Sequence, residues 1–248
     1  MHNTLPKFIK VLGFQVFSDN LGLIPINDRQ TRVINTISPN SYGIAVRDTT
    51  FRRALVESDY LVLDGVYFAL ASLLLHGTNI KRNQGPDVFA HFMDRLNHEG
   101  GKAFFLGSTT EVLGKIEDRA CQEYGNILVK TYSPPFKNEH SDSDNDTMIS
   151  AVNEFRPDVL FIGMTCPKQE KWAIRNKEAI NAGLIISVGN VFDWFAGTQK
   201  VIHPVWFKLR LGWLVRIFYR PEIFRRNIKN QMKFFTDLVL YFFRLKKR

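Results

Sequence analysis

The chain has 248 residues, 45% of them hydrophobic, which is enough apolar material for one large α/β domain or two small ones and excludes a disordered protein. Its formal net charge is +9, no segment reaches the roughly 18 consecutive apolar residues of a membrane span, and the N-terminus lacks the pattern of a secretion signal. The two cysteines, Cys121 and Cys166, lie far apart without a paired motif, which fits a reducing cytoplasm, although a bond between them stays open.

Short apolar runs closed by turn residues recur along the first 190 residues and are predicted to be strands. They span residues 33–38, 60–64, 102–107, 126–132, 158–163 and 184–189. Amphipathic segments that end at glycine, such as 87–100 and 109–125, lie between them and are predicted to be helices. Strands that alternate with helices indicate an α/β fold, with a mostly parallel sheet covered by helices on both faces.

Positive charge is concentrated at the C-terminus. Residues 208–248 hold twelve Lys or Arg against two acids, so the body before them is close to neutral. Such a tail predicts an anionic partner, either nucleic acid, phospholipid or diphosphate.

A helix over residues 222–243 would be amphipathic at 100° per residue. Its apolar side would hold Phe224, Ile228, Met232, Phe235, Val239 and Phe242, and the opposite side Arg225, Arg226, Lys229 and Lys233. A basic, aromatic-rich helix of this kind is typical of binding at a membrane interface. The alternative is a helix that packs on the body and leaves its bases in solvent.

An acid ends the second predicted strand, in the run YLVLDG at residues 60–65. An unpaired carboxylate in apolar surroundings is costly, so Asp64 either has a structural partner or faces a ligand. Ligands of parallel α/β sheets bind beyond the carboxyl ends of the strands, which favours the ligand. Glycine and hydroxyl residues also follow other strands, at 38–41, 107–110 and 163–170, where they could bind an anion or a sugar or simply cap a helix.

Several site types lack their sequence signals. Neither G-x-G-x-x-G nor G-x-x-x-x-G-K-[ST] occurs, so a dinucleotide fold or an NTPase would lack its phosphate loop. The six histidines are scattered, with no pair at helical i, i+4 spacing. The acidic run at 142–146 fails as a calcium loop, because Thr147 and Asn153 stand where Gly and Glu are needed, and it is predicted to be a solvated loop and helix cap. We therefore expect no metal and no cofactor.

Six short motifs occur in the order found in one glycosyltransferase family. They are SPN at 38–40, LDG at 63–65, the spaced set Arg82, Gly85 and Asp87, PKQEKW at 167–172, VGNVFDWFAG at 188–197, and WLVR at 213–216 followed by Pro221 and Arg225-Arg226. With these motifs the chain resembles the WecG/TagA/CpsF glycosyltransferases from about residue 12 to about residue 230. The resemblance implies a Rossmann-like domain, residues 1–200, followed by a basic helical C-terminal appendage that binds the membrane, residues 201–248.

The resemblance also implies an activity. Family members are inverting, metal-independent enzymes that move a sugar from a UDP-sugar to a polyprenyl-diphosphate-linked sugar, in bacterial cell-surface polysaccharide synthesis. The chain would then lie peripherally on the cytoplasmic face of the plasma membrane, on an anionic surface, and a homo-oligomer is possible. The alternative is a basic nucleic-acid-binding α/β protein, suggested by the pI of 9.6. Against it stand the near-neutral body and the lack of a recognisable reading helix or stacking motif. An oxidoreductase with a divergent nucleotide loop is less favoured.

Site residues follow from the motifs. Asp64 corresponds to the general base, which suits a sugar hydroxyl that must lose a proton as it attacks. Asn40 and Ser38 would orient the acceptor or the base. At the position of Ser38 the family usually has Thr, which also carries a hydroxyl. The residues implied to contact donor or acceptor are Arg82, Asp87, Gly107, Gln169, Asp193, Arg216, Arg225 and Arg226. The last three would neutralise the leaving diphosphate, or supply charge to the membrane surface, or both.

Overall fold

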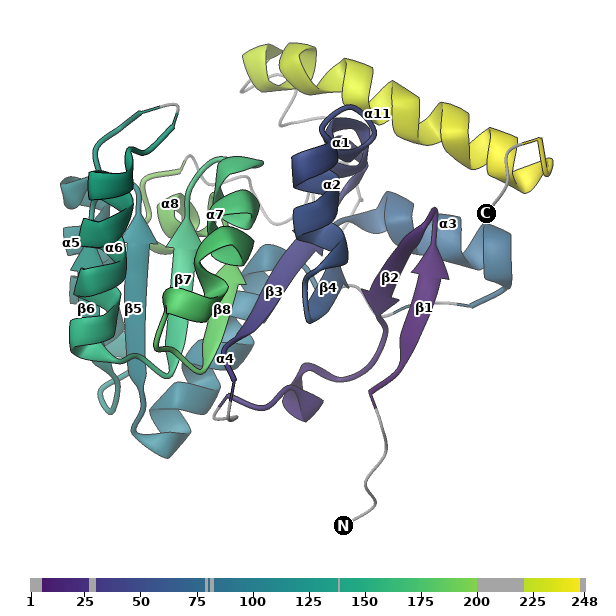
Figure 1. Cartoon of the computed structure of the whole chain (residues 1–248). Helices are drawn as coiled ribbons and strands as arrows, with labels where there is room; N and C mark the ends of the chain where they lie inside the picture. Colours follow the sequence, from purple (N-terminus) through teal and green to yellow (C-terminus); the bar gives the residue numbers. More distant parts are fainter. Residues whose placement is uncertain are drawn as a thin grey trace.

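Six parallel strands form the central sheet of the computed structural model (Figure 1), in the order β4-β3-β8-β7-β5-β6. The structure describes residues 6–26, 30–78, 80, 83–137, 139–199 and 221–245. The strands are β3 (Arg32–Ile37), β4 (Tyr60–Leu63), β5 (Lys102–Gly107), β6 (Leu128–Tyr132), β7 (Val159–Gly163) and β8 (Leu184–Ser187). Each lies within two residues of a predicted strand at both ends, so the predicted α/β sheet is confirmed.

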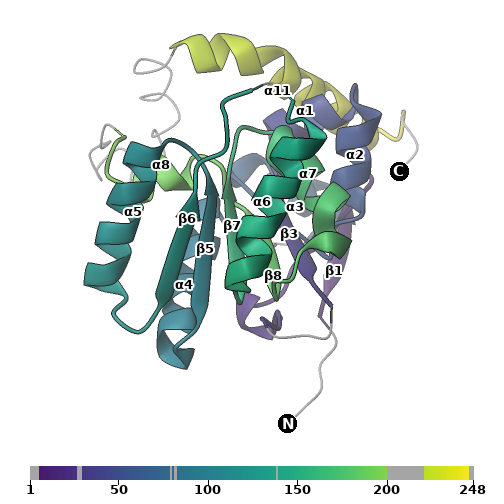
Figure 2. The same cartoon turned by 60° about the vertical axis from the view of Figure 1, so that its left-hand side comes forward.

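Helices cover both faces of the sheet, as predicted (Figure 2). One face carries α4 (Gly85–Glu99), α5 (Thr110–Glu123) and α8 (Val191–Phe195), and the other α2 (Thr49–Val56), α6 (Asp142–Phe155) and α7 (Lys168–Asn176). Because both faces are covered, the inner strands are continuous apolar runs, and Val159 to Ile162 of β7 are fully buried. Short 3-10 helices, η1 (Leu21–Leu23) and η2 (Lys177–Ala179), lie in the connections.

A hairpin that the sequence analysis did not assign precedes the sheet. It joins β1 (Phe8–Val11) to the antiparallel β2 (Phe14–Phe17). Leu12 and Gly13 both have positive φ, which is the geometry of a two-residue hairpin turn. The ring of Phe17 packs edge-on against Tyr60, with centroids 5.3 Å apart, so the hairpin shields the outer strand β4.

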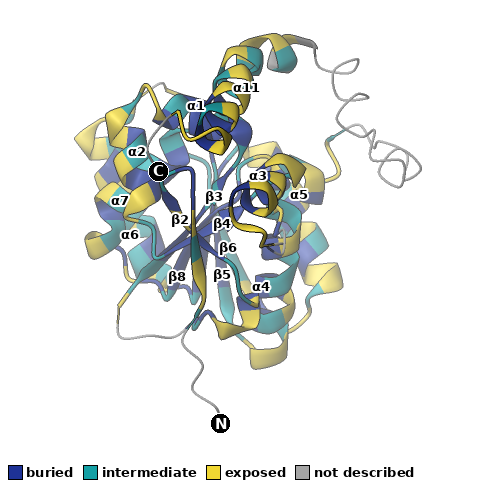
Figure 3. Cartoon of the chain, turned by 90° about the vertical axis from the view of Figure 1, so that its right-hand side faces the viewer, coloured by how far each residue is buried: buried dark blue, intermediate teal, exposed yellow. Residues whose placement is uncertain are grey.

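The C-terminal helix α11 (Pro221–Phe242) crosses α1 (Pro39–Ala45) on one side of the molecule, beside α3 (Val66–His76) (Figures 1 and 3). Phe234 is fully buried between Tyr42 and Phe68, with ring centroids 5.6 Å and 5.0 Å away. The buried carboxylate of Asp237 accepts a hydrogen bond of 2.9 Å from the Tyr42 hydroxyl. The appendage helix is therefore part of the folded core.

The buried side of α11 differs from the predicted apolar side. Phe234, Leu238 and Tyr241 face the core, whereas four of the six predicted apolar residues are exposed; those four are Met232, Phe235, Val239 and Phe242. The alternative of a packed helix is thus right for one side, and a second apolar side remains uncovered. The predicted domain boundary at 200 and 201 lies outside the described residues. Among the described helices, none has the length and apolarity needed to span a bilayer.

A buried acid lies where α7 covers the sheet. Glu170 is 2% exposed, and its Oε1 accepts a hydrogen bond of 2.9 Å from the Gln169 amide. Gln169 in turn accepts a hydrogen bond of 3.0 Å from the Gly189 N–H, which links the loops after β7 and β8. Burial raises the pKa of Glu170 above its ordinary value, because a charge is poorly solvated there.

Gly43 sets how closely α11 can approach α1. A Cβ at Gly43 would lie 2.4 Å from both the Cα and the carbonyl oxygen of Asn230, and backbone atoms cannot move aside cheaply. We expect Gly43→Ala to lower the free energy of unfolding by about 1–3 kcal/mol, the usual cost of overpacking. Gly114→Ala is the matched control, since nothing lies within 4 Å of that helical glycine and alanine should stabilise α5 by about 0.5–1 kcal/mol. Denaturant unfolding measures both, and equal effects would contradict the close contact.

Glu170→Gln should change how stability depends on pH. Because the folded pKa lies above the unfolded one, the folded state binds more protons between these values, and the stability of the parent falls as pH rises through that window. Glutamine keeps the acceptor oxygen for Gln169 and cannot ionise, so we expect the variant to gain on the parent as pH rises from about 4.5. Denaturant unfolding across pH checks this, with the exposed Glu178→Gln as control. Curves of parent and variant that stay parallel would refute it.

Candidate functional site

Predicted site residues meet at the carboxyl ends of the strands. Ser38 directly follows β3 and Asp64 directly follows β4, which are hydrogen-bonded neighbours. The Asp64 N–H donates a hydrogen bond of 2.9 Å to the Ile37 carbonyl, which holds the two strand ends together. Asp64 is half-buried. The Asp64 carboxylate after β4 and the N-terminus of α1 after β3 therefore lie at the same edge of the sheet. Ligands of parallel sheets bind at this edge.

Asn40 is held by a residue of α11 that the sequence analysis missed. The Arg47 guanidinium donates to Oδ1 of Asn230, which leaves the Asn230 amide nitrogen to donate to Oδ1 of Asn40 at 2.8 Å. The side-chain oxygen of Asn40 therefore already accepts a hydrogen bond. Its two amide hydrogens remain available to a ligand or to a neighbouring carboxylate. The sequence offered no signal for Asn230, because its partners Arg47 and Asn40 lie 183 and 190 residues away along the chain.

Two of the predicted residues cap helices. The Ser38 hydroxyl accepts a hydrogen bond of 3.3 Å from the Ser41 N–H, and the Ser41 hydroxyl accepts one of 2.7 Å from the Ser38 N–H, so together they close a capping box at α1. Asp87 is exposed and accepts a hydrogen bond of 3.0 Å from the Gln84 N–H at the start of α4. These helix caps account for both side chains structurally, and their contacts with substrate stay predictions.

Gly107 lies where β5 and β7 diverge. The chain leaves β5 towards β6 and leaves β7 towards β8, on the other side, and such a switch point is where ligands bind in open α/β sheets. Gly107 has φ of +122°, and a Cβ there would lie 2.7 Å from the Gly163 carbonyl oxygen, so only glycine fits. Ser108, the next residue, also has positive φ, at 59°.

Gln169 and Asp193 lie beside this switch point. Gln169 is 4% exposed, and its side-chain amide donates a hydrogen bond to Glu170 and accepts one from the Gly189 N–H. Gln169 therefore holds the loop after β8 in place. Asp193, half-buried on α8, accepts a hydrogen bond of 3.3 Å from the Thr198 hydroxyl. A direct contact of either residue with substrate stays a prediction.

Arg226 brings positive charge from α11 towards the loop after β7. Burial raises the pKa of the Cys166 thiol well above its usual range, and Arg226 opposes that rise, so its guanidinium lies within electrostatic reach of this loop. Arg225 is exposed on the same turn. Arg82 and Arg216, which were predicted to bind phosphate or sugar, lie outside the described residues.

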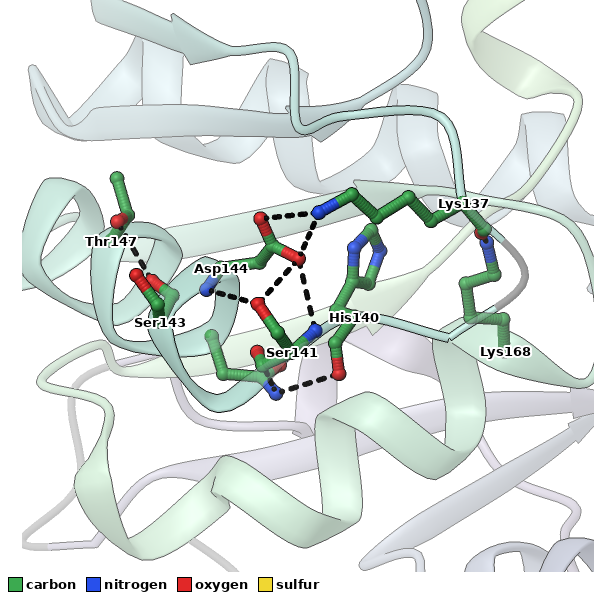
Figure 4. A network of polar contacts seen from close by, with 8 residues as sticks. Lys137, His140, Ser141, Ser143, Asp144, Thr147 and Lys168 are labelled. Carbon is green, nitrogen blue, oxygen red and sulfur yellow. Dashed lines mark hydrogen bonds and ion pairs between the residues drawn. The ribbon is translucent and has the colours of Figure 1, made fainter.

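The acidic run at 142–146 was predicted to be a solvated loop and helix cap, and the loop is wrong, because the run forms the first turn of α6 (Figure 4). Its part in the cap is confirmed, since Asp144 closes a capping box with the N-cap residue Ser141. The Ser141 hydroxyl accepts from the Asp144 N–H at 3.2 Å, and Asp144 accepts from the Ser141 N–H at 2.9 Å. The hydrogen bond from Lys137 holds the pKa of Asp144 well below its usual range, with help from Ser141. Within the described ranges, no three His, Cys, Asp or Glu side chains cluster in a way that could hold a metal ion.

Comparison with known proteins identifies the family. The model of the Glycosyl transferase WecG/TagA/CpsF family matches residues 11–248. An N-acetylglucosaminyldiphosphoundecaprenol N-acetyl-beta-D-mannosaminyltransferase of Bacillus subtilis (strain 168) is 25% identical over 212 residues, which are 86% of this chain and 81% of the relative. The protein of the same name from Staphylococcus aureus (strain NCTC 8325 / PS 47) is 27% identical over 187 residues, which are 74% of this chain and 70% of the relative. The matched span takes in the whole sheet, Asp64 and α11, and the chain belongs to the WecG/TagA/CpsF family of glycosyltransferases.

Proposed function

We propose that this glycosyltransferase moves an N-acetylhexosaminyl group from a UDP-sugar to a sugar carried on a polyprenyl diphosphate, in the synthesis of a bacterial cell-surface polysaccharide. Both relatives are named as N-acetylmannosaminyltransferases that act on an N-acetylglucosaminyl lipid diphosphate, so N-acetylmannosamine is the first candidate donor sugar and N-acetylglucosamine the first candidate acceptor sugar. The single observation that carries the proposal is the placement of Asp64 at the end of β4, beside the Ser38–Asn40 turn, in a chain of this family.

Asp64 is the general base of the proposed reaction. Its carboxylate accepts the proton of the acceptor hydroxyl, whose oxygen forms a bond to the anomeric carbon of the donor. The bond from that carbon to the diphosphate oxygen breaks, and UDP leaves from the opposite face, so the anomeric configuration inverts. A sugar hydroxyl is hardly ionised at neutral pH, and a positioned base is worth about 10²–10⁴ in rate.

Asn40 and the arginines supply the remaining groups. With its oxygen bound to Asn230, Asn40 presents amide hydrogens that suit the Asp64 carboxylate or an acceptor oxygen. Arg226, near the loop after β7, is the described candidate for the charge that builds up on the leaving diphosphate. Arg225, Arg82 and Arg216 keep the same proposed role. Transfer without a metal ion remains a prediction from the family resemblance.

The acceptor determines where the enzyme must work. A polyprenyl chain stays in the bilayer, so we propose that the enzyme binds peripherally to the cytoplasmic, anionic face of the plasma membrane. Its amphipathic α11 supports this, since such helices lie in membrane interfaces. The nucleic-acid alternative rested on the basic pI and is not supported, because the chain belongs to a glycosyltransferase family.

Asp64→Asn tests the proposed function. Asparagine keeps the shape and cannot accept the proton, so we expect kcat for transfer to a water-soluble sugar-diphosphate acceptor to fall by about 10²–10⁴, with UDP affinity nearly unchanged. Asp118→Asn, an exposed change on α5, should leave both values as they are. Initial rates and UDP titration measure the two quantities. Near-full turnover by Asp64→Asn would place the base elsewhere.

A further inference from the structure

Helix α3 is apolar on every side, yet the residues that the structure describes cover it on one side. Phe68, Ala71 and Leu75 are buried on the core side, and the segment Val66–His76 contains no acid, Lys or Arg. The opposite side exposes a helical stripe consisting of Val66, Tyr67, Leu70, Leu73 and Leu74, each 37% to 47% exposed. Helices that are apolar all round are normally buried all round. The stripe therefore indicates something that covers it in use.

The exposed side of α11 extends this stripe, and Figure 3 shows α3 and α11 each with exposed residues in yellow. The rings of Tyr67 and Phe235 meet edge-on with centroids 5.2 Å apart, and they join the two helices. Beyond Phe235, the residues Met232, Val239 and Phe242 are 62%, 53% and 51% exposed. We name the α3 stripe together with these four α11 residues the α3–α11 surface. It is one continuous apolar surface built from two segments about 160 residues apart in sequence.

Three bases of α11 lie away from the exposed apolar side. At 100° per residue, Arg226, Lys229 and Lys233 fall roughly 100° to 160° from the middle of that side, whereas the exposed Arg225 falls about 60° from it, on the flank of Met232. Arg226 lies within electrostatic reach of the loop beside the candidate site, since it opposes the rise that burial causes in the pKa of the Cys166 thiol there. Three sides of α11 therefore face three different surroundings: the core, the loop beside the candidate site, and the partner that contacts the α3–α11 surface.

We propose that the α3–α11 surface inserts into the interface of the lipid bilayer, so that the catalytic body itself, through α3, contacts the membrane. This proposal rests on the proposed function. The two relatives are named for an acceptor on diphosphoundecaprenol, whose hydrocarbon chain belongs in a bilayer. Helix α3 begins two residues after Asp64, so a bilayer against it brings the base close to the lipid head groups. A second copy of the chain seated there would instead separate Asp64 from the membrane.

The charge distribution favours lipid through apolar contact. Because α3 carries no acid, nothing on it repels anionic lipid, and binding through the stripe needs no counter-charge. Apolar insertion resists salt, whereas attraction between exposed charges is screened by it. The surface thus predicts membrane binding that persists at high ionic strength, unlike a tail held by its bases alone.

The double variant Leu70→Gln/Leu74→Gln tests the α3–α11 surface in the full chain. Both side chains are exposed, so folding should be unaffected, and Val56→Gln/Leu128→Gln is the matched control on exposed leucine and valine elsewhere. We expect partition onto phosphatidylglycerol–phosphatidylcholine vesicles to weaken at least about tenfold, both at low salt and in about 0.5 M salt, with the control unchanged. Unchanged vesicle binding by the double variant would overturn the proposal.

A tryptophan probe reads the contact directly. We expect the fluorescence of Leu73→Trp, beyond that of the parent, to be quenched by vesicles whose acyl chains carry bromine, and that of Leu128→Trp to be unaffected. A Leu73→Trp signal without quenching, while the protein is bound to the vesicles, would refute insertion of α3. Sedimentation without lipid covers the other occupant: a parent dimer that the double variant converts to monomer, with vesicle binding retained, assigns the surface to a second copy and also refutes the proposal.

Failure of this inference is distinguishable from failure of the proposed function. Transfer to a water-soluble acceptor needs no membrane, so the Leu70→Gln/Leu74→Gln variant should keep the kcat of the parent in that assay. If the parent protein transfers sugar but does not bind vesicles, membrane insertion of the α3–α11 surface is refuted and the proposed function stands. If the parent protein binds vesicles through α3 but transfers no sugar, the proposed function is refuted and the membrane contact stands.

Discussion

The crossing of α11 over α1 is the contact on which the rest of the molecule depends. Gly43 lets the two backbones approach at Asn230, closer than any side chain would allow. Beside that point, Asp237 is buried and accepts hydrogen bonds from the Tyr42 hydroxyl at 2.9 Å and from Lys233 at 2.8 Å. Burial raises the pKa of Tyr42 well above its usual range, so the phenol stays a donor. A buried carboxylate is tolerated only when it is paired in this way.

From this crossing, α11 faces the sheet edge on one side and the outside of the molecule on another. Asn230 donates a hydrogen bond to the side-chain oxygen of Asn40, and Arg226 lies within electrostatic reach of the loop after β7. On its outer side, α11 continues the exposed stripe of α3, which begins two residues after Asp64. In the proposed enzyme, the membrane contact and the chemistry therefore share a rigid frame. A lipid-linked acceptor would meet base, amide and arginine without the diphosphate leaving the bilayer surface.

The sequence alone was enough to predict the parallel sheet and the edge of the sheet at which the candidate site lies. Continuous apolar runs predict buried parallel strands, and polar residues directly after them, such as Asp64, predict a ligand edge. The hairpin at residues 8–17 was missed, because four-residue strands give too short a pattern. Periodicity correctly located an apolar side of α11, yet it could not show that the core takes the adjacent side around Phe234. Asn230 was unpredictable, since its role comes from Asn40 and Arg47, which are far away along the chain.

If α11 belongs to the active site, replacing Asn230 should lower the rate of transfer, and Asn230→Asp is the sharpest such change. Aspartate keeps the shape and the acceptor for Arg47, but it cannot donate to Oδ1 of Asn40, so the Asn40 amide should turn. The assay is transfer to a water-soluble acceptor, with Asn227→Asp, one turn earlier on α11, as control. The account predicts a kcat at least about tenfold lower for Asn230→Asp, with KM for the UDP-sugar and the free energy of unfolding close to those of the parent. An unchanged kcat in a folded Asn230→Asp variant would contradict it.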